Sequence, residues 1–155
     1  MTKLLREKAQ PQALLMRALR LFRPWPFSGR SARTFCGSAP SWWQRGWPRQ
    51  RVGSMAEVQL LAPLAEVLMP HLEIAEAFRS FPSPKGWGGN YLEPDLAAFG
   101  VLKDENAGLF VEYDGYWRHG EREGLKMDQK KNEALLLFAP KGSYVVRISH
   151  TIGMP

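Results

Sequence analysis

The sequence predicts an α/β fold, a small mixed sheet with flanking helices in the order α-β-β-β-α-β, preceded by a disordered basic leader. Three observations predict this fold. Positive charge is concentrated before residue 55, apolar residues recur with sustained helical and strand periods after it, and a short β-branched segment follows the last helical pattern. The predicted boundary therefore separates a leader, residues 1–54, from one domain, residues 55–155.

The charge of the chain is divided unevenly between these two parts. Residues 1–54 contain eleven Lys and Arg and one acid, Glu7, whereas residues 55–155 contain ten Lys and Arg against fourteen Asp and Glu. Much of the leader is rich in Pro, Ser, Gly and Trp, with no sustained period, which is typical of chain that cannot bury a core. The positive net charge of the chain, +6, therefore comes entirely from the leader. The acidic balance of the rest argues against a wholly basic nucleic-acid coat protein.

The leader has three interpretations. Its Arg-rich, acid-poor composition resembles an organelle transit peptide, and Arg33-Thr34-Phe35 before Cys36 resembles a mitochondrial processing site. The second interpretation is a disordered basic tail on a nuclear or cytoplasmic protein. The third is upstream sequence that is not normally translated, because Met55 could serve as an internal start.

Residues 41–49 of the leader mix three tryptophans with arginines. Indole rings beside guanidinium groups suit single-stranded nucleic acid or a membrane surface. Other classes are disfavoured: the single cysteine, Cys36, rules out an intramolecular disulfide and a Cys-rich zinc site. No apolar run reaches the length of a membrane-spanning helix.

The domain alternates helical and strand patterns. A helix is predicted over residues 57–69, and its apolar stripe consists of Leu60, Leu61, Leu64, Val67 and Leu68. Residues 71–78 fit either a strand or more helix, and residues 81–90, with two prolines and three glycines, are a predicted loop. Strands are then predicted over residues 91–101 and 109–117, a helix over 124–138 and a last strand over 144–149.

Acidic residues on the two central strands are the candidate chemistry. Glu112 and Asp114 project from the same face as Phe110, because side chains alternate along a strand. Partial burial of two neighbouring acids would raise their proton affinity, and a bound divalent cation removes that cost. Asp95 on the preceding strand could lie opposite them. Three converging carboxylates suit Mg²⁺, a hard ion with oxygen ligands.

The predicted helix over residues 124–138 adds a cation to this face. Asp128, Lys131, Leu135 and Phe138 recur with helical spacing, so Asp128 and Lys131 are expected at the margin of the buried face. A lysine held there could steady a phosphate or orient an attacking water. Lys130 points about one residue's turn away and is the weaker candidate.

These residues carry a resemblance to a known superfamily. The quoted segments are Pro94-Asp95, Glu112-Tyr113-Asp114-Gly115, Asp128-x-x-Lys131-x-x-x-Leu135 and Val146-Arg147-Ile148. Their order resembles the PD-(D/E)XK nucleases, nearest to the small restriction-endonuclease-like domains related to very short patch repair endonucleases, over residues 55–149.

The resemblance implies a metal-dependent nuclease acting on DNA or RNA, with Mg²⁺ or alternatively Mn²⁺ as cofactor. It implies Asp95 and Glu112 as metal ligands, Glu66 as an assisting acid from the first helix, and Asp114 as a further ligand or base. Arg118, His119 and Lys130 are the expected nucleic-acid contacts.

The sequence departs from the superfamily pattern at one position that matters for catalysis. Asp114 stands where the motif has its lysine, so that role is expected to move to Lys131 or to be lost. If it is lost, the domain is a catalytically inactive module that binds nucleic acid or serves as a scaffold. The domain's acidic balance, which fits a large DNA footprint poorly, favours this alternative.

Overall fold

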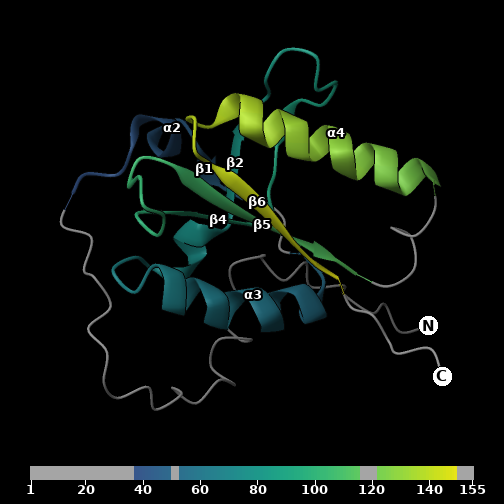
Figure 1. Ribbon diagram of the computed structural model, residues 1–155. Coiled ribbons are helices and arrows are strands. Elements are labelled where there is room, and N and C mark those ends of the chain that lie inside the picture. Colours follow the sequence, from purple (N-terminus) through teal and green to yellow (C-terminus); the bar gives the residue numbers. More distant parts are fainter. Residues whose placement is uncertain (1–36, 50–52, 116–121, 150–155) are drawn as a thin grey trace, which may run out of the picture.

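A computed structural model of the chain describes residues 37–49, 53–115 and 122–149 (Figure 1). Its centre is a three-stranded mixed sheet formed by β4 (Leu96–Phe99), β5 (Gly108–Asp114) and β6 (Tyr144–Ser149). Strand β5 is central, antiparallel to β4 and parallel to β6. The predicted mixed sheet with helices is therefore confirmed.

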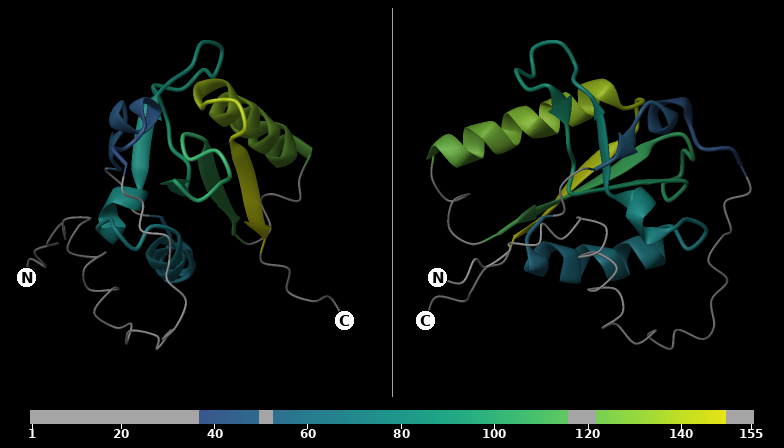
Figure 2. Two further views of the ribbon diagram at one scale, coloured as in Figure 1. Left: turned by 60° about the vertical axis from the view of Figure 1, so that its left-hand side comes forward. Right: turned by 180° about the vertical axis from the view of Figure 1, so that it is seen from behind.

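Two long helices lie on opposite sides of this sheet, α3 (Met55–Leu68) and α4 (Arg122–Phe138) (Figure 2). The parallel pairing of β5 with β6 requires a crossover connection, and α4 supplies it. No helix among the described residues is long and apolar enough to cross a membrane.

A second, antiparallel sheet was not predicted. It consists of β1 (Trp47–Pro48), β2 (Arg79–Pro82) and β3 (Tyr91–Leu92), with β2 in the middle. The predicted strand over residues 91–101 is thus two strands, β3 in one sheet and β4 in the other. Pro94 separates them, because proline has no N–H to continue a ladder. Strand β2 also takes up the first two residues of the predicted loop 81–90 and follows a short 3₁₀ helix, η1 (Ile74–Ala77).

Residues 37–49 belong to the folded part, whereas the sequence analysis assigned them to the leader. Helix α2 (Ser41–Gln44) buries Trp42 and Trp43. Trp42 lies 5.6 Å from Phe81 of β2 and 5.4 Å from Phe110 of β5, measured between ring centroids, so its indole fills the space between the two sheets. Its Nε1 donates to the carbonyl of Asn106 at 2.7 Å. The folded domain therefore begins before residue 41.

Helix α3 begins two residues earlier than predicted because Ser54 caps it. The Ser54 hydroxyl accepts from the N–H of Glu57, and the Glu57 carboxylate accepts from the N–H of Ser54, both at 3.2 Å. Its buried face also differs from the predicted leucine stripe, since Leu60 and Val67 are exposed. The buried residues are Val58, Leu61, Ala62 and Ala65. Alanines on this face allow the helix to lie close against β4, whose Ala97 and Ala98 are also buried.

Candidate active site

Glu112 is a buried acid in the middle of the mixed sheet. It is 2% exposed, because it lies on a central strand beside apolar neighbours. Lys131 of α4 donates from Nζ to Glu112 Oε2 at 2.5 Å. The other carboxylate oxygen, Oε1, is buried without a hydrogen-bond partner among the described residues. Glu112 therefore presents one paired and one unpaired oxygen on a face of the strand that is not solvated.

The surroundings of Glu112 raise the pKa of its carboxyl group. Burial first, and then the nearby charge of Asp95, raise the pKa of Glu112 to about 7 against the opposing attraction of Lys131. Its pKa is therefore well above the ordinary value of a glutamate. A group with these properties can exchange a proton or accept a cation at physiological pH.

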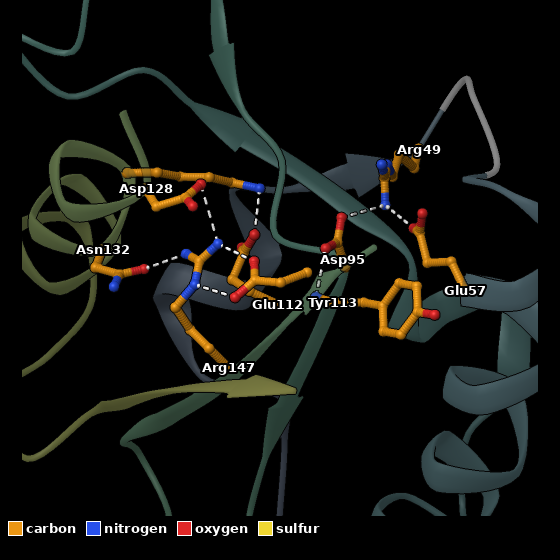
Figure 3. Close-up of polar contacts among 10 residues, drawn as sticks. Arg49, Glu57, Asp95, Glu112, Tyr113, Asp128, Asn132 and Arg147 are labelled. Atoms are coloured by element: carbon orange, nitrogen blue, oxygen red, sulfur yellow. Dashed lines mark hydrogen bonds and ion pairs between the residues drawn. The ribbon is translucent and has the colours of Figure 1, made fainter. Parts of the chain in front are cut away.

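Asp95 lies beside Glu112, as predicted. The register pairs Leu96 with Val111, so the next positions along the two strands are Asp95 and Glu112. The N–H of Tyr113 donates to Asp95 Oδ2 at 2.8 Å, which fixes the carboxylate at the end of β4 (Figure 3). Asp95 also contributes to the raised pKa of Glu112 through charge repulsion. The two carboxylates therefore lie close enough for their negative charges to repel each other.

Asp114 faces the same side of the sheet as Glu112 but is held by Arg147. Arg147 Nε donates to Asp114 Oδ2 at 2.9 Å, and its NH2 contacts Asp114 Oδ1. The same guanidinium contacts Asp128 Oδ1 and Asn132 Oδ1, each at 3.0 Å (Figure 3). Asp114 and Asp128 therefore share one guanidinium, which offsets one of their two negative charges. Within the described ranges, no group of three His, Cys, Asp or Glu side chains is arranged to hold a metal ion.

No family model, curated protein or solved structure matches this chain. The chemistry of the site is therefore inferred from the geometry of its residues alone.

Helix α3 contributes Glu57 to this region. Glu66, the acid expected from this helix, is exposed. Glu57 Oε1 instead contacts Arg49 NH1 at 3.3 Å, and the same NH1 lies 3.5 Å from Asp95 Oδ1 (Figure 3). Burial raises the pKa of Glu57, and Asp95 raises it further. Arg49 thus bridges two acids that repel each other.

Sequence reasoning missed Glu57 and Arg49. The Ser54-x-x-Glu57 pattern was the available signal for Glu57, because a capping box places an acid in the first helical turn. Arg49 had no comparable signal.

The expected nucleic-acid contacts are only partly described. Arg118 and His119 lie outside the described residues. Lys130 is exposed on α4, and its Nζ lies 5.9 Å from the ring centroid of Trp87. Lys130 is thus directed toward the loop between β2 and β3, on a different side from Lys131.

The donor set fits a hard divalent cation. Asp95 and Glu112 supply carboxylate oxygens from adjacent strands, and Glu112 Oε1 is a buried oxygen that lacks a partner in the described structure. Magnesium is commonly held by one or two carboxylates together with waters and substrate phosphates. The pair Asp95 and Glu112 meets that requirement without Asp114.

Proposed function

We propose that the protein is a metal-dependent nuclease that hydrolyses phosphodiester bonds of DNA or RNA. The observation that carries this proposal is the contact of Lys131 Nζ with Glu112 Oε2 at 2.5 Å. It supports a displaced catalytic lysine, supplied by α4 instead of by the strand position that Asp114 occupies.

Asp95 and Glu112 would hold the metal, Mg²⁺ or Mn²⁺. When bound, the ion lowers the pKa of a coordinated water and neutralises charge on the phosphoryl group. Lys131 places its ammonium beside the metal-binding oxygens, where it stabilises an anionic nucleophile or a substrate phosphate. The backbone N–H of Tyr113 holds Asp95 in orientation, at 2.8 Å.

The cluster around Arg147 has a positioning role in this proposal. Arg147 joins Asp114 of β5 to Asp128 and Asn132 of α4. Lys131 lies on the same helix, between Asp128 and Asn132 in the sequence. The cluster therefore fixes the helix segment that carries Lys131 against the strand that carries Glu112.

One observation favours the second candidate, an inactive module of the same fold. Arg49 contacts both Asp95 and Glu57, and Arg147 contacts both Asp114 and Asp128, so each of these acids already has an internal cation beside it. A module of this kind needs no metal for its stability or binding.

A cleavage assay with the full-length chain separates the two candidates. Labelled DNA and RNA are incubated with Mg²⁺, with Mn²⁺ or with EDTA, using wild type, Asp95→Ala, Glu112→Gln and Lys131→Met. The matched controls are Glu66→Gln, an exposed acid of α3, and Lys126→Met, an exposed lysine of α4.

The nuclease proposal expects cleavage that depends on metal. It expects a loss of about 10²-fold or more in the three site variants and wild-type rates in both controls. Absence of cleavage under all metal conditions, together with unchanged folding, would refute it and favour the module.

A further inference from the structure

We propose that the outer face of the small sheet is a stacking platform for single-stranded nucleic acid, which makes single strands the substrate of the nuclease. This inference extends the proposed function. It starts from Trp47 of β1 and Tyr91 of β3. The register pairs Trp47 with Ser80 and Tyr91 with Pro82, so both aromatic side chains project from the same face of β2.

The two rings are exposed although each is large and apolar. Trp47 is 37% exposed and Tyr91 is 46% exposed, and their ring centroids are 6.5 Å apart at an interplanar angle of 83°. Pro82 is exposed between them on the middle strand. The neighbouring Trp42 and Trp43 are buried in the core, whereas Trp47 is partly exposed and can contact a ligand.

Charge around these rings favours an anionic partner. The segments around the rings, residues 37–49 and 79–93, carry the exposed cations Arg45 and Lys85 and one acid, Glu93, whose carboxylate accepts from the Ser80 hydroxyl at 2.6 Å. Lys130 of α4 lies 5.9 Å from the ring of Trp87, whose Nε1 donates to the carbonyl of Tyr91 at 3.1 Å. Cations interleaved with exposed rings match the chemistry of a single strand, whose bases stack and whose phosphates need positive partners.

The platform is continuous with the candidate active site along two chain segments. Arg49 follows β1, two residues after Trp47, and Asp95 lies four residues after Tyr91, beyond the end of β3. At about 3.3 Å per residue of extended chain, these segments span at most roughly 7 Å and 13 Å. A strand stacked on Trp47 and Tyr91 therefore has its neighbouring phosphates within a few nucleotides of Asp95 and Glu112.

Single strands fit this surface better than a duplex does. Bases in a duplex are stacked on each other and do not offer a free face to Trp47 or Tyr91. From residue 37 to the end, the chain carries thirteen basic against fourteen acidic side chains, a balance that disfavours the many phosphate contacts of a duplex footprint.

Binding without metal tests this inference separately from catalysis. The full-length chain in EDTA is titrated against labelled single-stranded DNA, single-stranded RNA and duplex DNA of about twelve nucleotides, with fluorescence anisotropy as the readout. The variants are Trp47→Ala and Tyr91→Ala. Tyr144→Ala is the matched control, because Tyr144 is 61% exposed on β6 of the other sheet. Trp47→Phe and Tyr91→Phe retain a ring, and thermal unfolding checks every variant.

The platform predicts tighter binding of single strands than of duplex. It predicts about tenfold weaker binding in each alanine variant, near wild-type binding in the phenylalanine variants, and no change in Tyr144→Ala. Equal binding of duplex and single strands, or wild-type affinity in folded Trp47→Ala and Tyr91→Ala, overturns the inference even if cleavage is observed. Ring-dependent binding without any metal-dependent cleavage upholds the platform and refutes the nuclease. An equal loss in the control Tyr144→Ala would also overturn it.

Discussion

Replacing Glu112 by glutamine is expected to stabilise the protein at alkaline pH. Glu112 is buried, and burial raises its pKa to about 7 despite the contact with Lys131. Glutamine has nearly the same shape but carries no charge, so it removes the cost of an ionised carboxylate in this position. The substitution therefore separates the electrostatic cost of Glu112 from its packing.

The size of the effect follows from the two pKa values. The folded-state pKa of Glu112, about 7, is higher than the ordinary value of 4.5, so the folded protein retains the proton when the unfolded chain has released it. Stability from the protonated carboxyl is fully present below about pH 4.5 and is lost as the pH rises through 7. At ~1.4 kcal/mol per pH unit, the loss reaches about 3 kcal/mol above pH 8 and is under about 1 kcal/mol at pH 5.

Urea unfolding of wild type and Glu112→Gln at several pH values measures this difference. The free energy of unfolding of Glu112→Gln minus that of wild type is expected to rise by roughly 2–3 kcal/mol between about pH 5 and pH 8. Glu66→Gln, on the exposed side of α3, is the control and should show no such rise. A pH-independent difference would refute the argument that burial dominates the environment of Glu112.

Three further predictions test other parts of the account. Lys131→Met leaves Glu112 without its cation, so the midpoint of its titration, followed by carboxyl NMR, should move above 7; a midpoint at or below the wild-type value would contradict the pairing. A chain of residues 55–155 lacks Trp42 and Trp43, each worth about 3–5 kcal/mol in the core, and is expected to lose cooperative thermal unfolding, which a chain of residues 37–155 should retain; a folded 55–155 fragment would refute this domain boundary. Ser54→Ala removes the cap of α3 and should lower the free energy of unfolding by ~1 kcal/mol in denaturant titration, whereas an unchanged midpoint would show that the cap is dispensable.

The local periods of the sequence account for the elements that were predicted well. Residues 144–149 form a strand as expected, and the predicted helix over residues 124–138 differs from α4 by two residues at its start. Long-range contacts account for what was missed. No period marks Trp42 and Trp43 as core residues, because a four-residue helix is too short to show one. Their burial depends on the space between two sheets, and the smaller of these sheets was not predicted.

The same distinction applies to the candidate site. Alternation along β5 and spacing along α4 were sufficient to place Glu112 and Lys131 on facing surfaces, and the structure brings them into contact. The position of Asp114 on the same face as Glu112 was also predicted, but its ion pair with Arg147 was not. Arg147 reaches Asp114 through the parallel pairing of β6 with β5, and parallel register across a helical crossover is not encoded in any local pattern. The contacts of Arg49 could not be predicted from a local pattern either, because Arg49 is far from Asp95 in the sequence.

A crystal structure of the full-length chain with Mn²⁺ near pH 8 tests the central claim most directly, because the anomalous signal locates the ion. The account predicts one ion in contact with the carboxylates of Asp95 and Glu112, with Lys131 remaining beside Glu112. Crystals in which Lys131 and Arg49 keep their present contacts and no ion lies at either carboxylate would contradict it.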